Sequence, residues 1–378
     1  MSGADATIRP AGSGGMGRGG EVTAAAAVAM DPTGEAGIRA PRHGSRLPVT
    51  VGGLVATALA SARGVIGYAV LGLLAAGAGA VADAYTTVTL ARILALGLLA
   101  VSVAVVTGWA GLPSLGQVAP FAVGAYTAAL LARAGHPIGL VHVGAALVAA
   151  GLFAAATGLA VVRTRGTAFL MVTLAVGELT AAVAARWTSL TGGSDGLAGI
   201  PATRPVWGVL ALTDDRHVYW YVLAVTALVV AVTVAVLRSA AGLLLTGVRD
   251  HEARMRACGH PVAVYLLAAY TGAGAIAGVG GALLVSAQRY ISPADVGFEV
   301  AALVLLAVIV GGTTSIGGAF VGAGLIVGTR DWLAGPWPGH APLLLGTVLI
   351  ATVYLLPGGL AGLIDRLRQR AARPGVRS

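Results

Sequence analysis

The sequence contains no lysine, so all 24 of its basic residues are arginines. A nucleotide-binding P-loop needs a lysine at the phosphates, and Schiff-base chemistry needs the amine of a lysine. The chain therefore hydrolyses no ATP by way of a P-loop and forms no lysine-linked intermediate. Cys258 is its single cysteine, which excludes intramolecular disulfide bonds and metal sites built from several cysteines.

Charged residues are scarce as well. They make up 10% of the 378 residues, whereas soluble domains carry about 25%. Hydrophobic residues make up 57%, and the mean hydropathy is +0.87. These values are those of an integral membrane protein, in which the 57 glycines let helix backbones approach one another closely. The net charge of +9 predicts no nucleic-acid partner, because the arginines gather at the termini and in certain loops, as the positive-inside rule describes.

The apolar segments predict an all-α fold, a polytopic membrane helix bundle of about 8–10 transmembrane helices with broken or re-entrant segments. This transmembrane domain covers residues 63–365. Residues 1–62 predict a disordered cytoplasmic extension, and residues 366–378 a basic cytoplasmic tail. Glycines interrupt 300–311 and 317–333, which are therefore also compatible with one bent helix. The expected spans are 65–81, 88–106, 114–131, 138–162, 167–185, 218–237, 262–286, 300–311, 317–333 and 343–363.

The distribution of arginine orients these spans. With the N-terminus inside, ten spans also place the C-terminus in the cytoplasm. The inner side then holds 17 arginines and the outer side 5, with Arg92 and Arg330 left near span ends. This asymmetry supports the assignment. It places an external loop at 187–217 and a hydrophilic cytoplasmic loop at 239–261.

The external loop opens with a polar, glycine-rich stretch, 187–201, whose backbone groups would have no partners in lipid. It contains a G-x-S-x-G pattern around Ser194, followed by Asp215 and His217 in the order of a hydrolase triad. A nucleophile elbow needs a strand before its serine and a helix after it, and neither is expected here. We therefore interpret the stretch as a loop shaped by glycine and turn residues. Its candidate residues are Thr191, Gly192, Gly193, Ser194, Asp195 and Gly196.

The cytoplasmic loop predicts a short polar helix. Residues 250–257 are good helix formers with alternating charge, and Gly259 and Pro261 end the helix. Two interpretations remain open, a solvated connector between spans and a coupling helix that docks into a soluble partner. The second would involve Arg249, Asp250, His251, Glu252, Ala253, Arg254, Arg256 and Gly259.

Two polar residues stand within expected spans. Glu178 is an ionisable group at membrane depth and hence a functional candidate, although a hydrogen bond to a neighbouring helix, with Arg92 as one possible partner, is the simpler explanation. Gln117 belongs to a segment interrupted by proline and glycines, whose backbone groups could line a pathway. The seven histidines show no ligand spacing, so no metal site is expected.

Five ordered blocks of this sequence resemble the membrane permease subunits of bacterial ABC importers for branched-chain amino acids. The likeness extends over about residues 88–365 and is densest in the external stretch. The first block joins Gly108–Gly116 to Phe121–Thr127, and the last joins Tyr290–Pro293 to Gly311–Gly318. The blocks between them are Arg165–Glu178, Ser189–Pro201 and Arg249–Gly259.

The resemblance implies a transport subunit of the bacterial inner membrane that is not an enzyme. It would move leucine, isoleucine and valine, or a related small polar solute, into the cell. Its partners would be ABC ATPase subunits, a second homologous permease, an extracytoplasmic amino-acid-binding protein and the lipid membrane. ATP would be bound by the ATPase subunits, with no cofactor in this chain, and residues 249–259 would contact them. The alternative is an ion- or proton-coupled secondary transporter with Glu178 as the proton carrier.

Overall fold

The computed structural model of the chain describes residues 72–79, 83–205 and 211–333, together with Leu343, Gly346, Thr347, Ile350 and Gly362 taken singly. The expected extension, the basic tail and most of the expected span 343–363 lie outside these residues. The described ranges are helical, with two isolated bridges and no strand. Residues 72–79 are helical. The labelled helices that follow are α2 (Ala84–Ala104), η1 (Val105–Trp109), α3 (Val118–Arg133), α4 (Gly139–Val161), α5 (Gly166–Arg186), α6 (Thr188–Thr191), η2 (Gly193–Asp195), α7 (Asp215–Arg238), α8 (Ala240–Ala257), α9 (Val262–Gln288), η3 (Pro293–Val296), α10 (Phe298–Gly311) and α11 (Ile316–Leu333).

Six of the described helices are long and apolar enough to cross a membrane. These are Ala84–Trp109, Gly139–Val161, Gly166–Arg186, Asp215–Arg238, Val262–Gln288 and Pro293–Gly311. The all-α, polytopic fold is thereby confirmed. The expected span 114–131 is shorter than predicted, because its helix begins only at Val118. Residues 111–117 form an irregular segment after the π-helical turn η1, so this part of the bundle is broken as the glycines and proline indicated.

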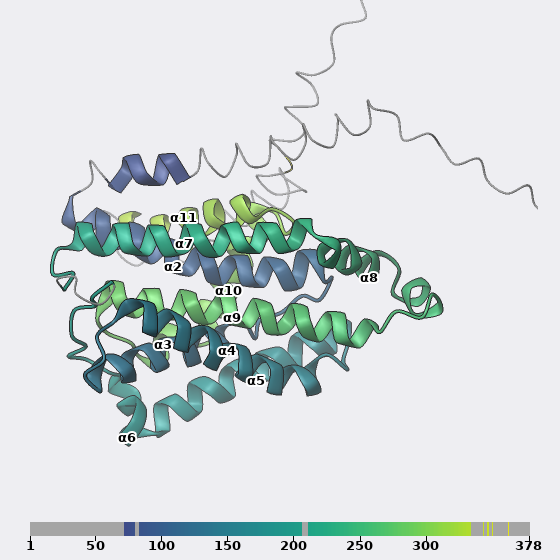
Figure 1. The fold of residues 1–378 in the computed structure, drawn as a ribbon, viewed down its shortest axis with the longest axis horizontal. Helices are drawn as coiled ribbons and strands as arrows, with labels where there is room; N and C mark the ends of the chain where they lie inside the picture. The colour runs from purple at the N-terminus through teal and green to yellow at the C-terminus, as the bar shows by residue number, and fades with distance from the viewer. Residues whose placement is uncertain are drawn as a thin grey trace, which may run out of the picture. The chain divides into compact units, whose positions relative to one another are not determined.

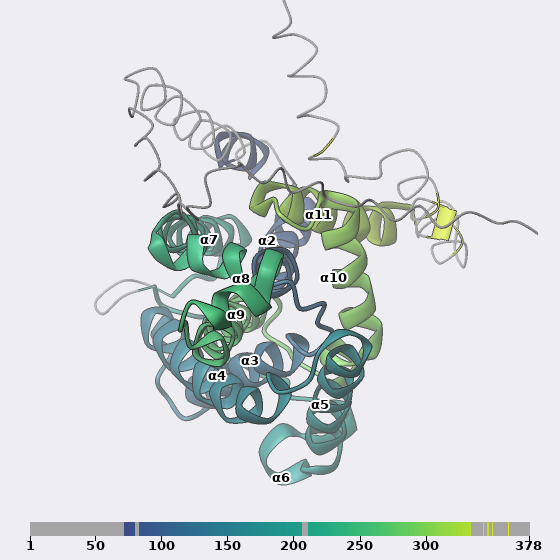
Figure 2. The same cartoon turned by 90° about the vertical axis from the view of Figure 1, so that its right-hand side faces the viewer.

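Helix α9 lies at the centre of the bundle and packs along α2, α3 and α4 (Figures 1 and 2). Its glycines make that packing possible. A Cβ atom on Gly278 would meet the Cβ atom of Ala150 in α4, and one on Gly281 would meet the carbonyl oxygen of Phe121 in α3. The small-residue face predicted in this helix is therefore a close-packing surface, as GxxxG spacing favours in membranes.

Helices α10 and α11 are two separate elements, so the alternative of one bent helix is wrong. Gly312 joins them with a φ of 104°, a conformation that glycine adopts without strain. The backbones of Gly311 and Gly318 approach so closely that a Cβ atom on either would meet the carbonyl oxygen of the other. Figure 2 shows α10 between α11 and α5.

Replacing Gly278 by alanine is expected to destabilise the protein, because the new methyl group overlaps Ala150. Overpacking of this kind typically costs about 1–3 kcal/mol. Gly272→Ala is the matched control on the same helix, since a Cβ atom at Gly272 meets nothing within 4 Å. Thermal unfolding in detergent should show a lower midpoint for Gly278→Ala and an unchanged or higher one for Gly272→Ala. Equal midpoints would contradict the packing described for α9.

Candidate functional site

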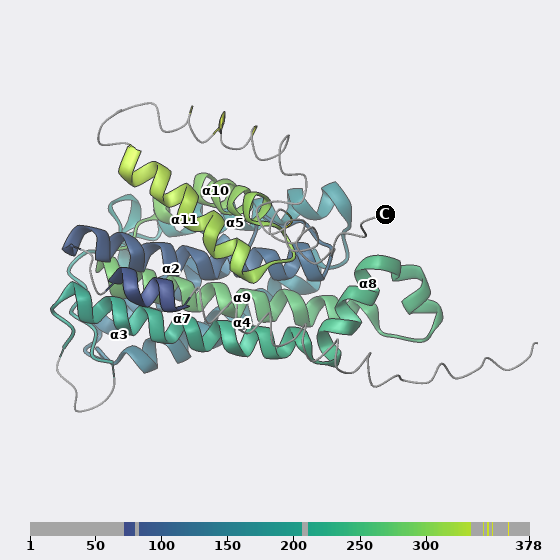
Figure 3. The same cartoon turned by 90° about the horizontal axis from the view of Figure 1, so that it is seen from above.

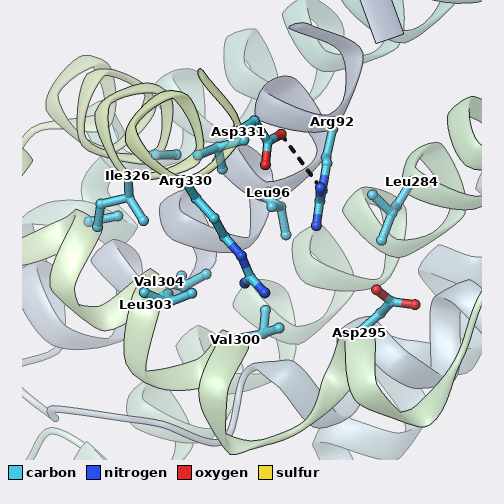
Figure 4. Close-up of a pocket in the computed structure, with 13 residues that line it drawn as sticks. Arg92, Leu96, Leu284, Asp295, Val300, Leu303, Val304, Ile326, Arg330 and Asp331 are labelled. Atoms are coloured by element: carbon cyan, nitrogen blue, oxygen red, sulfur yellow. Dashed lines mark ion pairs between the residues drawn. The ribbon is translucent and has the colours of Figure 1, made fainter. Parts of the chain in front are cut away.

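A cavity with charged and apolar walls lies between α2, η3, α10 and α11 (Figure 4). Counting its open mouth, it contains about 570 Å³ of empty space. Four charged side chains line it, Arg92, Asp295, Arg330 and Asp331. The apolar part of the wall includes Leu96, Leu284, Val300, Leu303, Val304 and Ile326.

The four charges of this cavity come from three segments far apart in the sequence. Arg92 Nη1 lies 3.5 Å from Asp331 Oδ2, across the contact between α2 and α11. Arg330 Nη1 lies 3.1 Å from Glu299 Oε1 on α10. Asp295 Oδ2 accepts hydrogen bonds from the backbone N–H and the hydroxyl of Ser292, 3.0 and 2.9 Å away. The suggested pairing of Arg92 with Glu178 is therefore wrong.

Sequence reasoning missed this cavity as a site. Its only signal was that Arg92 and Arg330 fell within expected spans, near their ends. Asp295, Glu299 and Asp331 carry no motif and come together only because α10 and α11 fold back on α2.

Helix α8 occupies the loop that was predicted to be cytoplasmic, 239–261, and lies beyond the ends of α7 and α9 in Figures 1 and 3. The prediction of a hydrophilic loop with a helix from Asp250 is corrected, because the helix begins ten residues earlier, at Ala240. Ser239 caps it by accepting a hydrogen bond from the N–H of Ala241. Its first half is apolar and buries Leu245 and Val248 against the bundle. At His251 the backbone leaves helical geometry (φ −149°, ψ 73°), so the predicted polar helix corresponds to the half after a kink.

Glu252 fastens the polar half of α8 to the bundle. Its two carboxylate oxygens accept hydrogen bonds from Arg165, at 3.0 Å from Nη2 and 3.2 Å from Nε. Arg256 Nη2 adds a third at 2.6 Å. These bonds favour the charged carboxylate, so the Arg165 guanidinium, and secondarily that of Arg256, hold the pKa of Glu252 below its ordinary value.

A second contact ties α8 to the broken part of the bundle. Arg249 Nη1 donates to the carbonyl oxygen of Gly108 in η1 at 2.6 Å, while its Nε donates to Asp250 at 2.9 Å. Gly259 follows the helix with a φ of 82°. The remaining predicted coupling residues are exposed and lie after the kink or at it, namely His251, Ala253, Arg254 and Arg256.

Gln117 lies fully buried at the start of α3, beside the irregular segment 111–117. Its Oε1 accepts a hydrogen bond from the hydroxyl of Ser102 at 3.0 Å. Its Nε2 has no partner among the described residues. A buried amide left in this state costs about 1–3 kcal/mol. The structure thus places Gln117 in the interior of the subunit.

Glu178 has the opposite environment. Its side chain is exposed near the middle of α5. Only 22% of the most apolar window of this helix is buried. The neighbouring Leu179 and Met171 are 66% and 67% exposed. One face of α5 is therefore uncovered in this chain, and that face carries a carboxylate at membrane depth.

The stretch predicted to be external, 187–201, is a folded loop held by hydrogen bonds to neighbouring segments. Gly192, Gly193 and Gly196 adopt φ angles of 77°, 70° and 74° around η2, and the Thr191 hydroxyl donates to the carbonyl oxygens of Ala184 and Trp187. Leu197 and Ile291 exchange backbone hydrogen bonds at 2.8 and 3.2 Å. Ser194 and Asp195 are exposed within η2, which follows α6. The strand that a nucleophile elbow requires is absent at this point, as the sequence predicted.

Comparisons with known proteins agree with this arrangement. The family described as branched-chain amino acid transport system permease component matches residues 85–353. Two curated proteins named high-affinity branched-chain amino acid transport system permease protein LivM, from Salmonella typhimurium and Escherichia coli, are each 31% identical over 281 residues. The matched region covers 68% of this chain and 65% of each relative, slightly under two thirds of their length. No solved structure matches the chain.

The link between Glu252 and Arg165 is expected to depend on pH. Because the pKa of Glu252 is lowered on folding, the stabilisation is fully present above its ordinary pKa of 4.5 and is lost as the pH falls through the folded value. The side chains of Arg165 and Glu252 are each about one third exposed. Loss of their link should therefore raise the rate of amide hydrogen exchange in α8 by at most about fivefold. At pH 7 the α8 amides should exchange faster in Glu252→Gln than in the unchanged protein. Below the folded pKa of Glu252 the two proteins should exchange at the same rate. Asp250→Asn is the control, and equal exchange of Glu252→Gln and the unchanged protein at pH 7 would contradict the fastening.

Proposed function

This chain belongs to the family of branched-chain amino acid transport permeases, and from this membership we propose that it is the membrane-spanning permease subunit of an ABC importer. It moves leucine, isoleucine and valine, or a related small solute, into the cell. It lies in the bacterial inner membrane with both termini in the cytoplasm. Separate ATPase subunits power it, and a soluble binding protein delivers the amino acid to the outer side.

The geometry of α8 carries this proposal. The two halves of this helix comprise 18 residues, and neither belongs to a membrane span. A solvated connector between α7 and α9 needs neither that length nor fixed attachment. Here Glu252 binds Arg165 at the start of α5, and Arg249 binds the backbone of η1. A push on α8 would therefore reach two membrane elements directly, as a coupling helix requires.

The exposed face after the kink supplies the docking surface. Arg254, Arg256 and His251 project from it, and Glu252 is occupied by the bundle. An acidic groove on an ATPase subunit would complement this basic face. ATP itself binds to that partner, because the present sequence has no lysine for a P-loop.

The uncovered face of α5 supports a second permease subunit. A carboxylate exposed to lipid at the middle of a helix costs about 2.5–3.5 kcal/mol, so Glu178 requires a protein or aqueous neighbour. A homologous subunit packed along α5 would provide one, and the transport pathway would run between the two subunits. The external stretch follows α5 directly and would lie at the outer mouth of that pathway, where the binding protein docks.

A proton-coupled secondary transporter would use the same Glu178 as its proton carrier. The family match favours the importer over this alternative. The two differ in a simple property, because only the importer requires ATP and an ATPase that co-purifies.

Reversing the charge of Arg254 is expected to weaken docking of the ATPase. Arg254→Glu would face the acidic groove with a like charge and lower both co-purification of the ATPase and ATP-driven leucine uptake by about tenfold or more. Arg133→Glu, at the opposite end of the bundle, should leave both unchanged. The double variant Glu252→Ala with Arg254→Ala tests attachment and docking together. Retention of ATPase and uptake in Arg254→Glu and in the double variant would remove α8 from the coupling role.

Replacing Glu178 by leucine separates a pathway residue from one that merely faces lipid. If the second subunit and the pathway cover α5, uptake in proteoliposomes should fall by about tenfold or more while ATPase co-purification persists. Glu178→Gln should retain part of the activity, and Leu179→Ala on the same helix should retain all of it. Full uptake with a higher folded yield in Glu178→Leu would show that the face contacts lipid.

A further inference from the structure

A second cavity, of about 550 Å³, lies between the polar half of α8, the connection from α4 to α5 and the start of α9. Three arginines and one glutamate line it, Arg163, Arg165, Arg256 and Glu252, beside apolar residues of α4 and α9. We propose that this cavity binds an anionic phospholipid, with its phosphodiester on the arginines and an acyl chain along the apolar wall. The proposal rests on the inner-side position proposed for α8 and adds a lipid ligand to it.

The cavity lies at the depth of lipid headgroups. Arg163 and Arg165 belong to the four residues 162–165 that separate the membrane spans α4 and α5. Four residues reach at most about 14 Å when fully extended, so this connection turns back close to the hydrocarbon. Ala263 also lines the cavity and is the second residue of the span α9. The charged groups therefore stand at a boundary between lipid and water.

Two positive charges of the cavity are not neutralised by its own acid. Glu252 is held by Arg165, whose Nη1 also donates to two backbone carbonyl oxygens. Arg256 uses one nitrogen, Nη2, for Glu252. No described residue forms a hydrogen bond or an ion pair with the guanidinium group of Arg163. Because a guanidinium group has five N–H donors, Arg163 and Arg256 still offer most of theirs to a ligand.

A phosphodiester with no compensating positive charge suits these donors. Guanidinium groups bind phosphate oxygens through paired N–H donors, whereas the two excess arginines repel the ammonium of a zwitterionic lipid. The first turn of α9 adds to the positive potential, because it has no acidic residue and no side-chain cap. Basic pockets between spans on the cytoplasmic side are places where anionic headgroups bind.

The apolar part of the wall fits an acyl chain. It is formed by Leu159 and Val162 of α4 together with Val264 and Leu267 of α9. Leu159 and Val264 are 60% and 59% exposed, so the cavity opens to the surroundings between apolar side chains. Its volume falls in the range of small-molecule pockets, about 300–1,000 Å³. Headgroup and chain contacts together favour a phospholipid over free phosphate, which cannot use the apolar wall.

A lipid in this position gives α8 a second attachment to the bundle. Arg163 follows α4, whereas Arg256 belongs to the polar half of α8. A phosphodiester bound by both arginines bridges the two elements, next to the link between Glu252 and Arg165. The attachment of α8 then depends on the lipid composition of the membrane.

Native mass spectrometry of the purified full chain tests this site with phosphatidylglycerol and phosphatidylcholine of identical acyl chains as probes. Phosphatidylglycerol should bind at least about tenfold more tightly. Arg163→Gln and Arg256→Gln should each weaken its binding about fivefold, the contribution of one arginine near an anionic lipid. The double variant should remove the preference, and Arg163→Lys should retain most of it. Arg254→Gln is the matched control, because Arg254 is exposed on the same half of α8 but does not line the cavity.

Two further measurements separate a lipid from a free anion and test the attachment. Inorganic phosphate or glycerophosphoglycerol, the headgroup without chains, should leave phosphatidylglycerol bound at concentrations up to about 10 mM. In nanodiscs that contain phosphatidylglycerol, the α8 amides should exchange hydrogen more slowly than in nanodiscs of phosphatidylcholine alone. Arg163→Gln should abolish this difference. Equal exchange in the two lipids would remove the second attachment.

Three results would overturn the site. Equal binding of the two lipids would mean unselective contact, and a full preference in the double variant would place the anion elsewhere. Displacement by phosphate alone would mean a free-anion site. ATP-driven leucine uptake without the lipid preference removes the site and leaves the importer standing. A preference that depends on Arg163 supports the site even if uptake proves independent of ATP, a result that would count against the importer alone.

Discussion

The close contact of α9 with α2, α3 and α4 is the interaction on which the other features depend. Without a hydrophobic force between helices in lipid, association relies on close packing, and the glycines of α9 allow its backbone to approach those of its neighbours. That helix also connects the two functional ends of the subunit. α8 precedes it on one side, and η3 with Asp295 follows it on the other.

The broken segment between α2 and α3 provides a second connection between the ends. η1 continues α2 as a π-helical turn, and Arg249 of α8 binds the carbonyl oxygen of Gly108 within it. π-Helical turns occur frequently at functional sites, because they leave the regular hydrogen-bond ladder. Gln117 lies a few residues further on, buried with an amide that lacks a partner among the described residues.

Hydropathy and glycine content were enough to predict the helical bundle, the break before α3 and the packing face of α9. They work because lipid forces every backbone group into local hydrogen bonds, which leaves helices as the solution for apolar segments. Ordered sequence blocks then predicted the family. The start of α8 was missed because residues 240–245 are apolar but follow α7 directly, and only the cap at Ser239 separates them. The partner of Arg92 was missed because Asp331 lies 239 positions away in number and pairs only after α10 and α11 turn at Gly312.

Charge is distributed in this subunit according to what each region must contact. In the polar half of α8, Glu252 accepts hydrogen bonds from Arg165 of the bundle and from Arg256 of the same helix, while Arg254 stays exposed. The cavity between α2, η3, α10 and α11 carries two arginines and two aspartates, and Arg92 pairs there with Asp331. Glu178 lies on the exposed face of α5. Because lipid cannot solvate its charge, this face of α5 requires a protein or aqueous neighbour. In the proposed importer, the pathway would form along this face of α5.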